Sequence, residues 1–394
     1  MKLNVVDYYG CPGGGARFAS ELLQAMCACE KSLCVELISH GNALIRYRQL
    51  FGKAPFVSRI TDIPPANILS GNIGGLRGSW RLLRLMGIAE KFYEIPQAAT
   101  ADCDAVWFPW AQKHRLISGD GRCAVATYHD LNIFEADRCD DRMDRAEEDE
   151  TLATWFRSPA KIVTSSDTSA EKILARSGAA KDRVHVIPLT GNHAINGEWA
   201  ESAPAFPWCA DPFLLCPANT ARHKNHEVLF QGIGAWGCKY PLVLTGSESE
   251  LPWYRSRGFH LRRIAAENNL HIGRTLHPLG YVPDSVYFNL LYHVWAMVMP
   301  TLAEGGGSFP VWEALWKGVP ILCSDIPIMR EMLRRAGGEV LFFNPRDASD
   351  LAEKLDDLET NYTYYKNRAL DQIRNLKVRS WKEIASDYLR LLVL

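Results

Sequence analysis

Residues 301–325, TLAEGGGSFPVWEALWKGVPILCSD, place a Gly-rich turn between two carboxylates, Glu304 and Glu313. Behind the turn, FPVWEALWKG predicts a helix and VPILCSD predicts a buried strand. Glycines before a helix leave backbone N–H groups exposed, so a phosphate can approach them closely. Carboxylates repel phosphate, but they accept hydrogen bonds from sugar hydroxyls. The stretch therefore favours a ligand that is anionic in one part and polyhydroxylated in another, such as a nucleotide-sugar.

The whole chain alternates strands with helices, which predicts parallel sheets covered by helices on both faces. Residues 190–208 are rich in Gly, Pro and small polar residues, as linkers are, and place a domain boundary near residue 200. We therefore expect two doubly wound α/β domains facing a cleft, with ligands beyond the carboxyl ends of the strands. The predicted strands are 3–9, 33–39, 105–108, 124–129, 161–165, 184–188, 213–217, 242–246, 275–280, 296–300, 320–324 and 340–344.

Three helices can be predicted from local patterns. Thr168 and Glu171 are spaced as a capping box that would open the helix SAEKILARSG. KNHEVLFQGIGAW has Leu229, Ile233 and Trp236 on one face. SWKEIASDYLRLLVL ends the chain as an amphipathic helix.

Composition excludes several classes of protein. The 394 residues are 47% hydrophobic and 23% charged, which is typical of a globular protein, and a net charge of −1 argues against nucleic-acid binding. The eleven cysteines lack the spacing of a zinc site. With no signal peptide and no apolar run long enough to span a membrane, we expect a cytoplasmic protein.

Two further segments follow predicted strands. The first is YYGCPGGGARF, where Gly14 and Gly15 belong to a run of glycines that can meet a pyrophosphate or sugar, although a tight turn alone would also use glycine. It does not fit a dinucleotide-binding motif, because Phe18 occupies the last glycine position. The second is YHDL, where His129 would stand at the opening of its strand; a lone histidine is more often structural.

CPANTARHKNHEVL places basic side chains between a strand and a helix. A lysine at a helix N-terminus, here Lys224, is disfavoured by the helix dipole unless it faces an anion held at the same place. The alternative is a solvated basic turn.

Together these motifs resemble the GT-B-fold retaining glycosyltransferases, specifically family four. That family carries E-G-F-G-x-P-x-x-E-A followed by G-x-P-x-x-x-S-D, and this chain has EGGGSFPVWEA followed by GVPILCSD. Further similarities are YHDL, SSDTSAEKIL, RVHVIPL, HKN and LGYVPDSVYFNLLYHVWAMVMPT, in the same order. The resemblance implies two Rossmann-like domains, an acceptor domain of residues 1–200 with the returning helix 379–394, and a donor domain of residues 201–378.

The resemblance also implies roles for individual residues. Glu304 would contact the donor sugar, Glu313 the ribose hydroxyls, Lys224 the diphosphate leaving group, and His129 the sugar. The remaining donor-binding positions would be Gly14, Gly15, Asn219, Arg222, Gly246, Tyr281, Val282, Gly306, Gly307 and Ser308.

Two departures from the family pattern stand out. Eight residues separate Glu304 from Glu313 where the family has seven, so the match between amides and ligand oxygens is open. Asn219 stands where the family often has an arginine, five residues before the lysine.

We therefore expect a retaining glycosyltransferase that moves a sugar from GDP-mannose or a UDP-hexose to a glycan or lipid-linked acceptor in polysaccharide or glycoconjugate biosynthesis. No D-x-D motif lies beside these residues, so we expect neither a metal nor a cofactor. The alternatives are a nucleotide-sugar hydrolase or epimerase of the same fold, and a catalytically silent partner subunit.

Two features bear on the acceptor. Arg77, Arg81 and Arg84 share one face of a predicted helix within 77–91. This face would contact anionic lipid head groups or a polyprenyl-diphosphate-linked acceptor at the membrane, or it would be an ordinary solvated face. Trp107 and Trp110 fit core packing or the stacking of an acceptor sugar.

Overall fold

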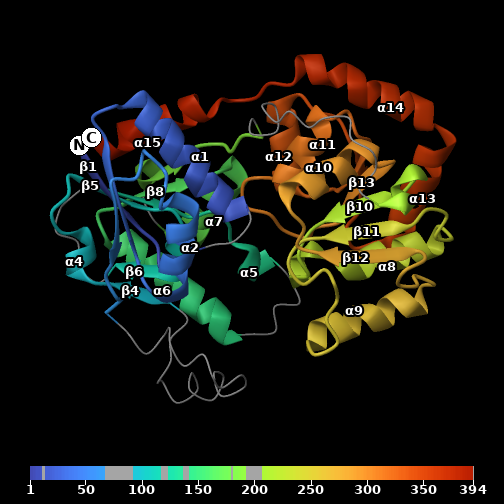
Figure 1. Ribbon diagram of the computed structural model, residues 1–394, viewed down its shortest axis with the longest axis horizontal. Helices are drawn as coiled ribbons and strands as arrows, with labels where there is room; N and C mark the ends of the chain where they lie inside the picture. Colours follow the sequence, from blue (N-terminus) through green and yellow to red (C-terminus); the bar gives the residue numbers. More distant parts are fainter. Residues whose placement is uncertain are drawn as a thin grey trace. The chain divides into compact units, whose positions relative to one another are not determined.

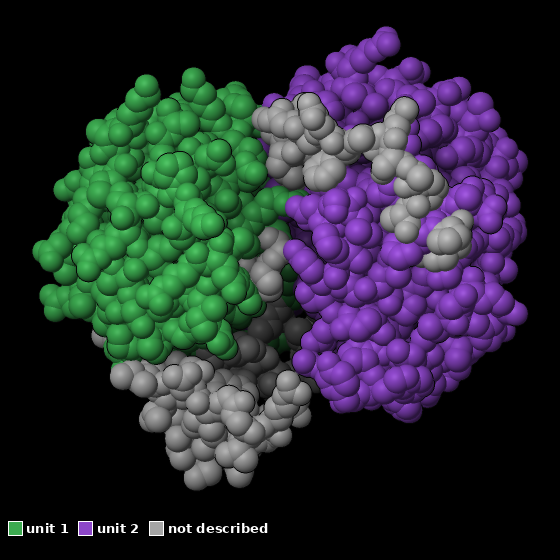
Figure 2. All heavy atoms as spheres, viewed as in Figure 1, with its two compact units in different colours: residues 1–133, 140–189, 379–394 green, residues 134–139, 190–378 purple. Residues whose placement is uncertain are grey.

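The computed structural model describes residues 1–10, 14–66, 92–116, 123–135, 142–178, 181–191 and 206–393. These fall into two compact units (Figures 1 and 2). Unit 1 comprises residues 1–133, 140–189 and 379–394, and unit 2 comprises residues 134–139 and 190–378. The boundary predicted near residue 200 lies outside the described residues.

Unit 1 is built on a seven-stranded parallel sheet of order β3-β2-β1-β5-β7-β8-β9. Its strands are β1 (Lys2–Val6), β2 (Cys34–Ser39), β3 (Arg59–Asp62), β5 (Ala105–Phe108), β7 (Cys123–Thr127), β8 (Lys161–Thr164) and β9 (Val184–Val186). A separate parallel pair joins β4 (Tyr93–Ile95) to β6 (His114–Leu116). The strands β1, β5 and β7 are buried almost throughout, as expected of central strands covered on both faces.

Among the described residues of unit 1, the helices are α1 (Gly14–Cys29), α2 (Gly41–Phe51), α4 (Gln97–Thr100), α6 (Arg142–Arg157), α7 (Asp167–Ser177) and α15 (Trp381–Val393). The short α5 (Asn132–Glu135) contains one division between the units.

Helix α15, the C-terminal end of the chain, belongs to unit 1, as the sequence predicted, and packs along α1 (Figure 1). Tyr388 is fully buried, with its ring edge-on to Trp107 and its hydroxyl 3.1 Å from the Thr127 hydroxyl. Lys161 of β8 donates to the Leu391 carbonyl at the helix end, at 2.7 Å. These contacts secure the last helix to the sheet of the first unit.

Unit 2 holds a six-stranded parallel sheet of order β12-β11-β10-β13-β14-β15. Its strands are β10 (Leu214–Pro217), β11 (Leu242–Thr245), β12 (Leu276–Gly280), β13 (Ala296–Met299), β14 (Ile321–Ser324) and β15 (Leu341–Phe343). Its helices are α8 (His226–Ala235), α9 (Ser256–Glu267), α10 (Asp284–His293), α11 (Phe309–Trp316), α12 (Pro327–Ala336), α13 (Ala348–Thr360) and α14 (Tyr362–Asp371).

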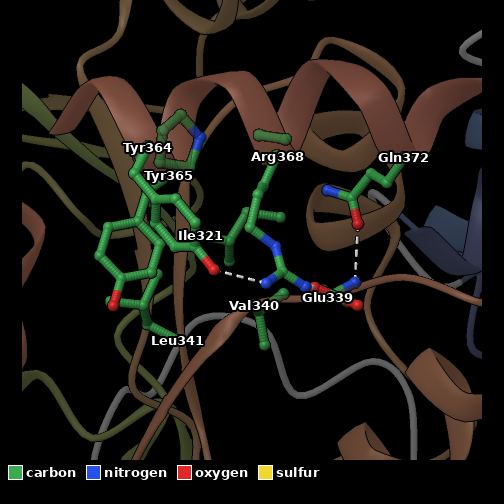
Figure 3. A pocket seen from close by; sticks show the side chains of 10 residues that line it. Ile321, Glu339, Val340, Leu341, Tyr364, Tyr365, Arg368 and Gln372 are labelled. Atoms are coloured by element: carbon green, nitrogen blue, oxygen red, sulfur yellow. Dashed lines mark hydrogen bonds and ion pairs between the residues drawn. The ribbon is translucent and has the colours of Figure 1, made fainter. Parts of the chain in front are cut away.

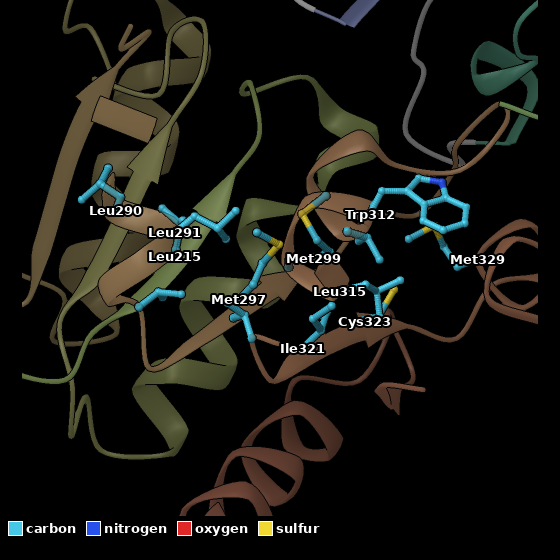
Figure 4. Packing of buried hydrophobic residues seen from close by; sticks show 14 of the residues in the cluster. Leu215, Leu290, Leu291, Met297, Met299, Trp312, Leu315, Ile321, Cys323 and Met329 are labelled. Atoms are coloured by element: carbon cyan, nitrogen blue, oxygen red, sulfur yellow. The ribbon is translucent and has the colours of Figure 1, made fainter. Parts of the chain in front are cut away.

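Alternate residues of each strand in unit 2 face different cores, because side chains alternate across a strand. Leu215, Met297 and Ile321 pack with α10, α11 and α12 (Figure 4). Leu214 and Leu322 pack on the other face with α8, α9 and α13. The sheet is thus doubly covered, and both units have the Rossmann-like architecture that the sequence predicted.

All twelve predicted strands are present, but the local predictions had errors. The capping box at Thr168 and Glu171 is wrong: Ser166 caps the helix by accepting from the Ser169 amide at 3.0 Å, and α7 begins at Asp167. The sequence also missed β3, β4 and β6, which have no clear apolar pattern.

Candidate functional site

An ion pair joins two of the predicted residues at the carboxyl ends of the strands of unit 2. Lys224 ends the 3₁₀ turn Arg222–Lys224 after β10, and its ammonium contacts Glu304 Oε1 in the turn after β13. The side chains are only 17% and 9% exposed. Because a buried charge without a counter-charge is very unfavourable, each group makes the other tolerable here.

The backbone around this ion pair is held by neighbouring loops. Asn225, in the left-handed conformation (φ +56°), donates from its side-chain Nδ2 to the Pro300 carbonyl at 3.0 Å and to the Pro345 carbonyl at 2.7 Å. The His223 carbonyl accepts from the Leu302 amide at 2.6 Å and from the Thr301 hydroxyl at 3.1 Å. The turn that carries Lys224 is therefore fastened directly to the loop that carries Glu304.

The Gly-rich turn passes directly beneath a methionine. Gly307 has φ +103°, and a Cβ there would overlap the sulfur of Met332 on α12. Ser308 is the N-terminal cap of α11, and its amide donates to Met332 Sδ at 3.4 Å. A thioether is a weak acceptor, so an anionic oxygen can replace it at little cost. The amides of Gly306 and Gly307 precede this cap.

Glu313 lies inside α11 and is 1% exposed. Its Oε2 accepts a hydrogen bond of 2.6 Å from the hydroxyl of Tyr287 on α10. The tyrosine thus stabilises the buried carboxylate and restricts its rotamer.

Two glycines lie where neighbouring strands of unit 2 end: Gly246 directly follows β11, and Gly280 is the last residue of β12. Gly246 has φ +116°, its amide donates to the Gly280 carbonyl at 2.8 Å, and a Cβ there would lie 3.0 Å from the Asn219 amide nitrogen. Beyond Gly280, Tyr281 is 68% exposed while Val282 packs against the core. Close backbone approach explains Gly246, whereas Gly280 has φ +74° and a Cβ there would meet the Glu250 side chain.

A second group of charged side chains lies beside the 3₁₀ turn Arg222–Lys224. Arg257 of α9 pairs with Glu227 of α8 at 2.6 Å and lies 3.4 Å from the Thr220 carbonyl. Burial, together with the cations Arg257 and Lys224, lowers the pKa of His226 to about 3. Arg222 is in the turn itself and is exposed to solvent. Asn219 uses its side chain locally, accepting from the Ala221 amide at 3.1 Å.

In unit 1 the end of β1 carries a buried carboxylate that the sequence reading missed. Asp7 is 2% exposed and accepts from the amides of Tyr9 (2.8 Å) and Gly10 (3.2 Å) and from the Tyr47 hydroxyl. His114 Nδ1 donates to the Trp110 carbonyl at 2.8 Å, so its Nε2 accepts from the Tyr8 amide at 2.9 Å. These contacts fix the start of the first Gly-rich loop.

His129 follows β7 and is almost wholly buried. Its Nε2 lies 2.9 Å from the Pro109 carbonyl and therefore carries the proton, which leaves Nδ1 as an acceptor. Burial lowers the pKa of His129 to about 4, so the ring is neutral near pH 7. It packs against Trp110 at 4.3 Å and edge-on to Phe18 of α1 at 4.8 Å.

The structure thus gathers the predicted residues in two sets. Unit 2 brings together the Lys224–Glu304 pair, the Gly306–Ser308 turn and the nearby strand ends. In unit 1, Gly14 and Gly15 begin α1, whose Phe18 contacts His129. Trp107 is fully buried, as the core interpretation requires, whereas Trp110 is partly buried and stacks on Tyr9 at 6.2 Å. The basic segment 77–91 lies outside the described residues.

The chain is similar to several known proteins. Residues 210–375, most of unit 2, match the family model described as Glycosyl transferases group 1. The chain is 24% identical over 275 residues to the O-antigen chain mannosyltransferase B of Escherichia coli, covering 67% of this chain and 64% of that relative. The chain therefore spans somewhat less than two thirds of the length of this curated relative.

Solved structures share the fold along nearly the whole chain. Sucrose-phosphate synthase from Thermosynechococcus elongatus superposes with a TM-score of 0.64 at 16% identity, covering 99% of this chain and 98% of that one. HepE from Anabaena, solved with UDP and glucose, gives a TM-score of 0.63 at 14% identity, with coverage of 100% and 97%. The fold is the GT-B fold of glycosyltransferases.

Two searches of the described residues found nothing. No described helix is both long enough and apolar enough to cross a lipid bilayer. Within the same part of the chain, no three His, Cys, Asp or Glu side chains are grouped as a metal site would require.

Proposed function

We propose that this chain is a retaining glycosyltransferase of family four that takes a sugar from a nucleotide-diphosphate donor, GDP-mannose or a UDP-hexose, without a metal ion. The observation that carries the proposal is the Lys224–Glu304 pair at the strand ends of unit 2, beside the Gly-rich turn that opens α11. The family match over residues 210–375 and the similarity to a mannosyltransferase support the same assignment.

The chemistry follows from the charges at this edge of the sheet. Breaking a glycosyl–phosphate bond builds negative charge on the diphosphate and positive charge on the anomeric carbon. The Lys224 ammonium and the amides before α11 would stabilise the departing diphosphate, which is usually the largest contribution to such catalysis. Glu304 would accept hydrogen bonds from the sugar hydroxyls.

Lys224 can serve both partners. An ammonium has three N–H donors, so it can keep one hydrogen bond to Glu304 and direct another at a phosphate oxygen. In the same step the phosphate would replace Met332 Sδ as the acceptor of the Ser308 amide. Ligand binding then improves contacts that are already formed and requires little rearrangement of the backbone.

We further propose that the acceptor is a glycan or a lipid-linked glycan, in polysaccharide biosynthesis. The name of the Escherichia coli relative, an O-antigen chain mannosyltransferase, supports a polymer acceptor. Contact of segment 77–91 with anionic lipid remains a prediction from the sequence alone.

A panel of nucleotide-sugars tests the proposal. GDP-mannose and the UDP-, ADP- and dTDP-hexoses are added singly, and the melting temperature is followed, because a ligand that binds the folded state stabilises it by mass action. The best donor is then incubated with and without a lipid-linked glycan, and the products and their anomeric configuration are determined. Free sugar in the absence of acceptor would indicate a hydrolase, and donor binding without any turnover would indicate a silent subunit. No thermal shift with any donor would refute the proposal.

A further inference from the structure

A pocket lies in unit 2 (Figure 3). Its lining includes the first residues of β14 and β15, so it is at the opposite ends of the strands from the Lys224–Glu304 pair. It opens between the first residues of β14 and β15 and the helix α14, and its cavity volume is about 280 Å³. Strand β14 runs from this pocket toward the candidate donor site, so the two are separated by a distance on the order of 10 Å or more.

The wall of the pocket is one face of α14. Tyr364 and Arg368 of α14 and Gln372, which directly follows this helix, are spaced four residues apart, which aligns their side chains. Arg368 donates to the Tyr364 hydroxyl at 2.6 Å and pairs with Glu339, whose amide in turn donates to Gln372 Oε1 at 2.7 Å (Figure 3). The polar groups thus form one connected network around the opening.

The floor of the pocket is apolar, formed by the start of β14, the start of β15 and Ala369. The wall remains open to solvent, since Tyr364 is 53% exposed and the Arg368 and Glu339 side chains are 47% and 62% exposed. An apolar hollow with a few convergent polar groups is the usual form of a small-molecule site.

The chemistry of the wall selects a class of ligand. Arg368 and Glu339 cancel each other's charge, so the pocket favours a neutral ligand over an ion. The guanidinium, carboxylate and amide are planar groups that offer paired donors and acceptors, which suit adjacent hydroxyls. The Tyr364 ring and the apolar floor suit the C–H face of a ring. A cavity just below the usual range for drug-sized ligands holds about one such ring.

We propose that this pocket binds a single neutral hexose unit of a glycan, at a site separate from the one where transfer would occur. Such a site would hold a saccharide chain on unit 2. The binding requires no transferase activity; only the choice of mannose as a probe rests on the proposed function.

The test uses the full chain without any nucleotide. Methyl α-D-mannoside and a mannose trisaccharide are titrated by saturation-transfer NMR and calorimetry, with uridine and guanosine as competing flat-ring probes. A ligand of one ring should bind with a dissociation constant on the order of 1–10 mM. Tyr364→Ala and Gln372→Ala should weaken saccharide binding at least about tenfold, whereas Tyr364→Phe, which keeps the ring, should change it less than about threefold.

Two controls keep the result specific. Tyr292→Ala removes another half-exposed tyrosine of unit 2 and should leave binding unchanged. Glu304→Gln alters the candidate donor site and should also leave it unchanged, so failure of the proposed transfer reaction and failure of this pocket are distinguishable. Melting temperatures confirm that each variant is folded. The proposal is overturned if no saccharide binds, if the nucleosides bind at the pocket in place of the saccharides, or if binding survives Tyr364→Ala and Gln372→Ala.

Discussion

Each sheet has a buried carboxylate near the carboxyl ends of its strands, but the two carboxylates have different partners. In unit 1, Asp7 accepts hydrogen bonds from two loop amides and a tyrosine, all from its own unit. In unit 2, Glu304 pairs with Lys224, and an ammonium has three N–H donors, more than this one contact uses. The first edge is therefore satisfied by the fold itself. The second holds a charge pair that a ligand can join, and this difference predicts that mutations at the two edges will fail in different ways.

The largest effect is expected for Lys224→Ala. Removing the ammonium would deprive the departing diphosphate of the cation proposed to stabilise it, and loss of one such stabilising group typically lowers the rate about 10²–10³-fold. Initial rates of sugar transfer, measured with the donor chosen by the thermal-shift panel, check this expectation.

Lys239→Ala is the matched control for that substitution. Lys239 also pairs with carboxylates of unit 2, Asp356 and Glu359, but in an exposed position on the surface. It should change turnover by less than about twofold, because exposed ion pairs contribute little. Near-normal turnover of a folded Lys224→Ala protein would remove the proposed role of the lysine.

Asp7→Ala should affect stability rather than turnover. In this variant unit 1 should unfold more readily, without a direct effect on donor binding. Three donors would lose a buried acceptor, and together these losses cost about 2–3 kcal/mol of unfolding free energy. Hydrogen exchange, read by mass spectrometry for peptides of each unit separately, should show faster exchange in β1 and β2 than in β10 and β13.

Asp62→Ala controls for loss of a carboxylate in the same unit. Asp62 is half exposed and contacts only His40 among the ion pairs of the described residues. Its removal should change exchange very little. Equal exchange in Asp7→Ala and wild-type protein would contradict the idea that Asp7 fixes the first loop.

The sequence predicted the central strands well because they are buried on both faces. Runs such as AVWF and LVLT are apolar throughout, and parallel central strands require this pattern. Strand β3 (RITD) lies at the sheet edge and is half exposed, so it has no such pattern. The cap of α7 was misplaced because SSDTS offers several capping residues, and only the backbone conformation selects Ser166.

The sequence indicated which residues to consider for the candidate site, but it did not indicate which of them are in contact. Motif order identified Lys224 and Glu304, but their pairing depends on two loops that lie far apart in the sequence. Asn225 stands inside the HKN motif, and its left-handed conformation and two carbonyl contacts could have been suspected from an Asn directly before a helix. Met332 has no signal in the sequence, because its place over the turn follows from how α12 packs.

That methionine suggests a further test in the turn of unit 2, Gly307→Ala. Two causes destabilise this variant: a positive φ, which costs a non-glycine residue about 1 kcal/mol or more, and overlap with Met332 Sδ, which overpacks a close contact for about 1–2 kcal/mol more. Gly273→Ala separates the two causes, since Gly273 also has positive φ (+82°) but nothing within 4 Å of a new Cβ. Urea unfolding should show the larger loss for Gly307→Ala, and the excess should shrink when Met332→Ala is the background. An equal loss in both glycine variants would mean that the methionine yields freely, and that the turn of unit 2 is shaped by its backbone alone.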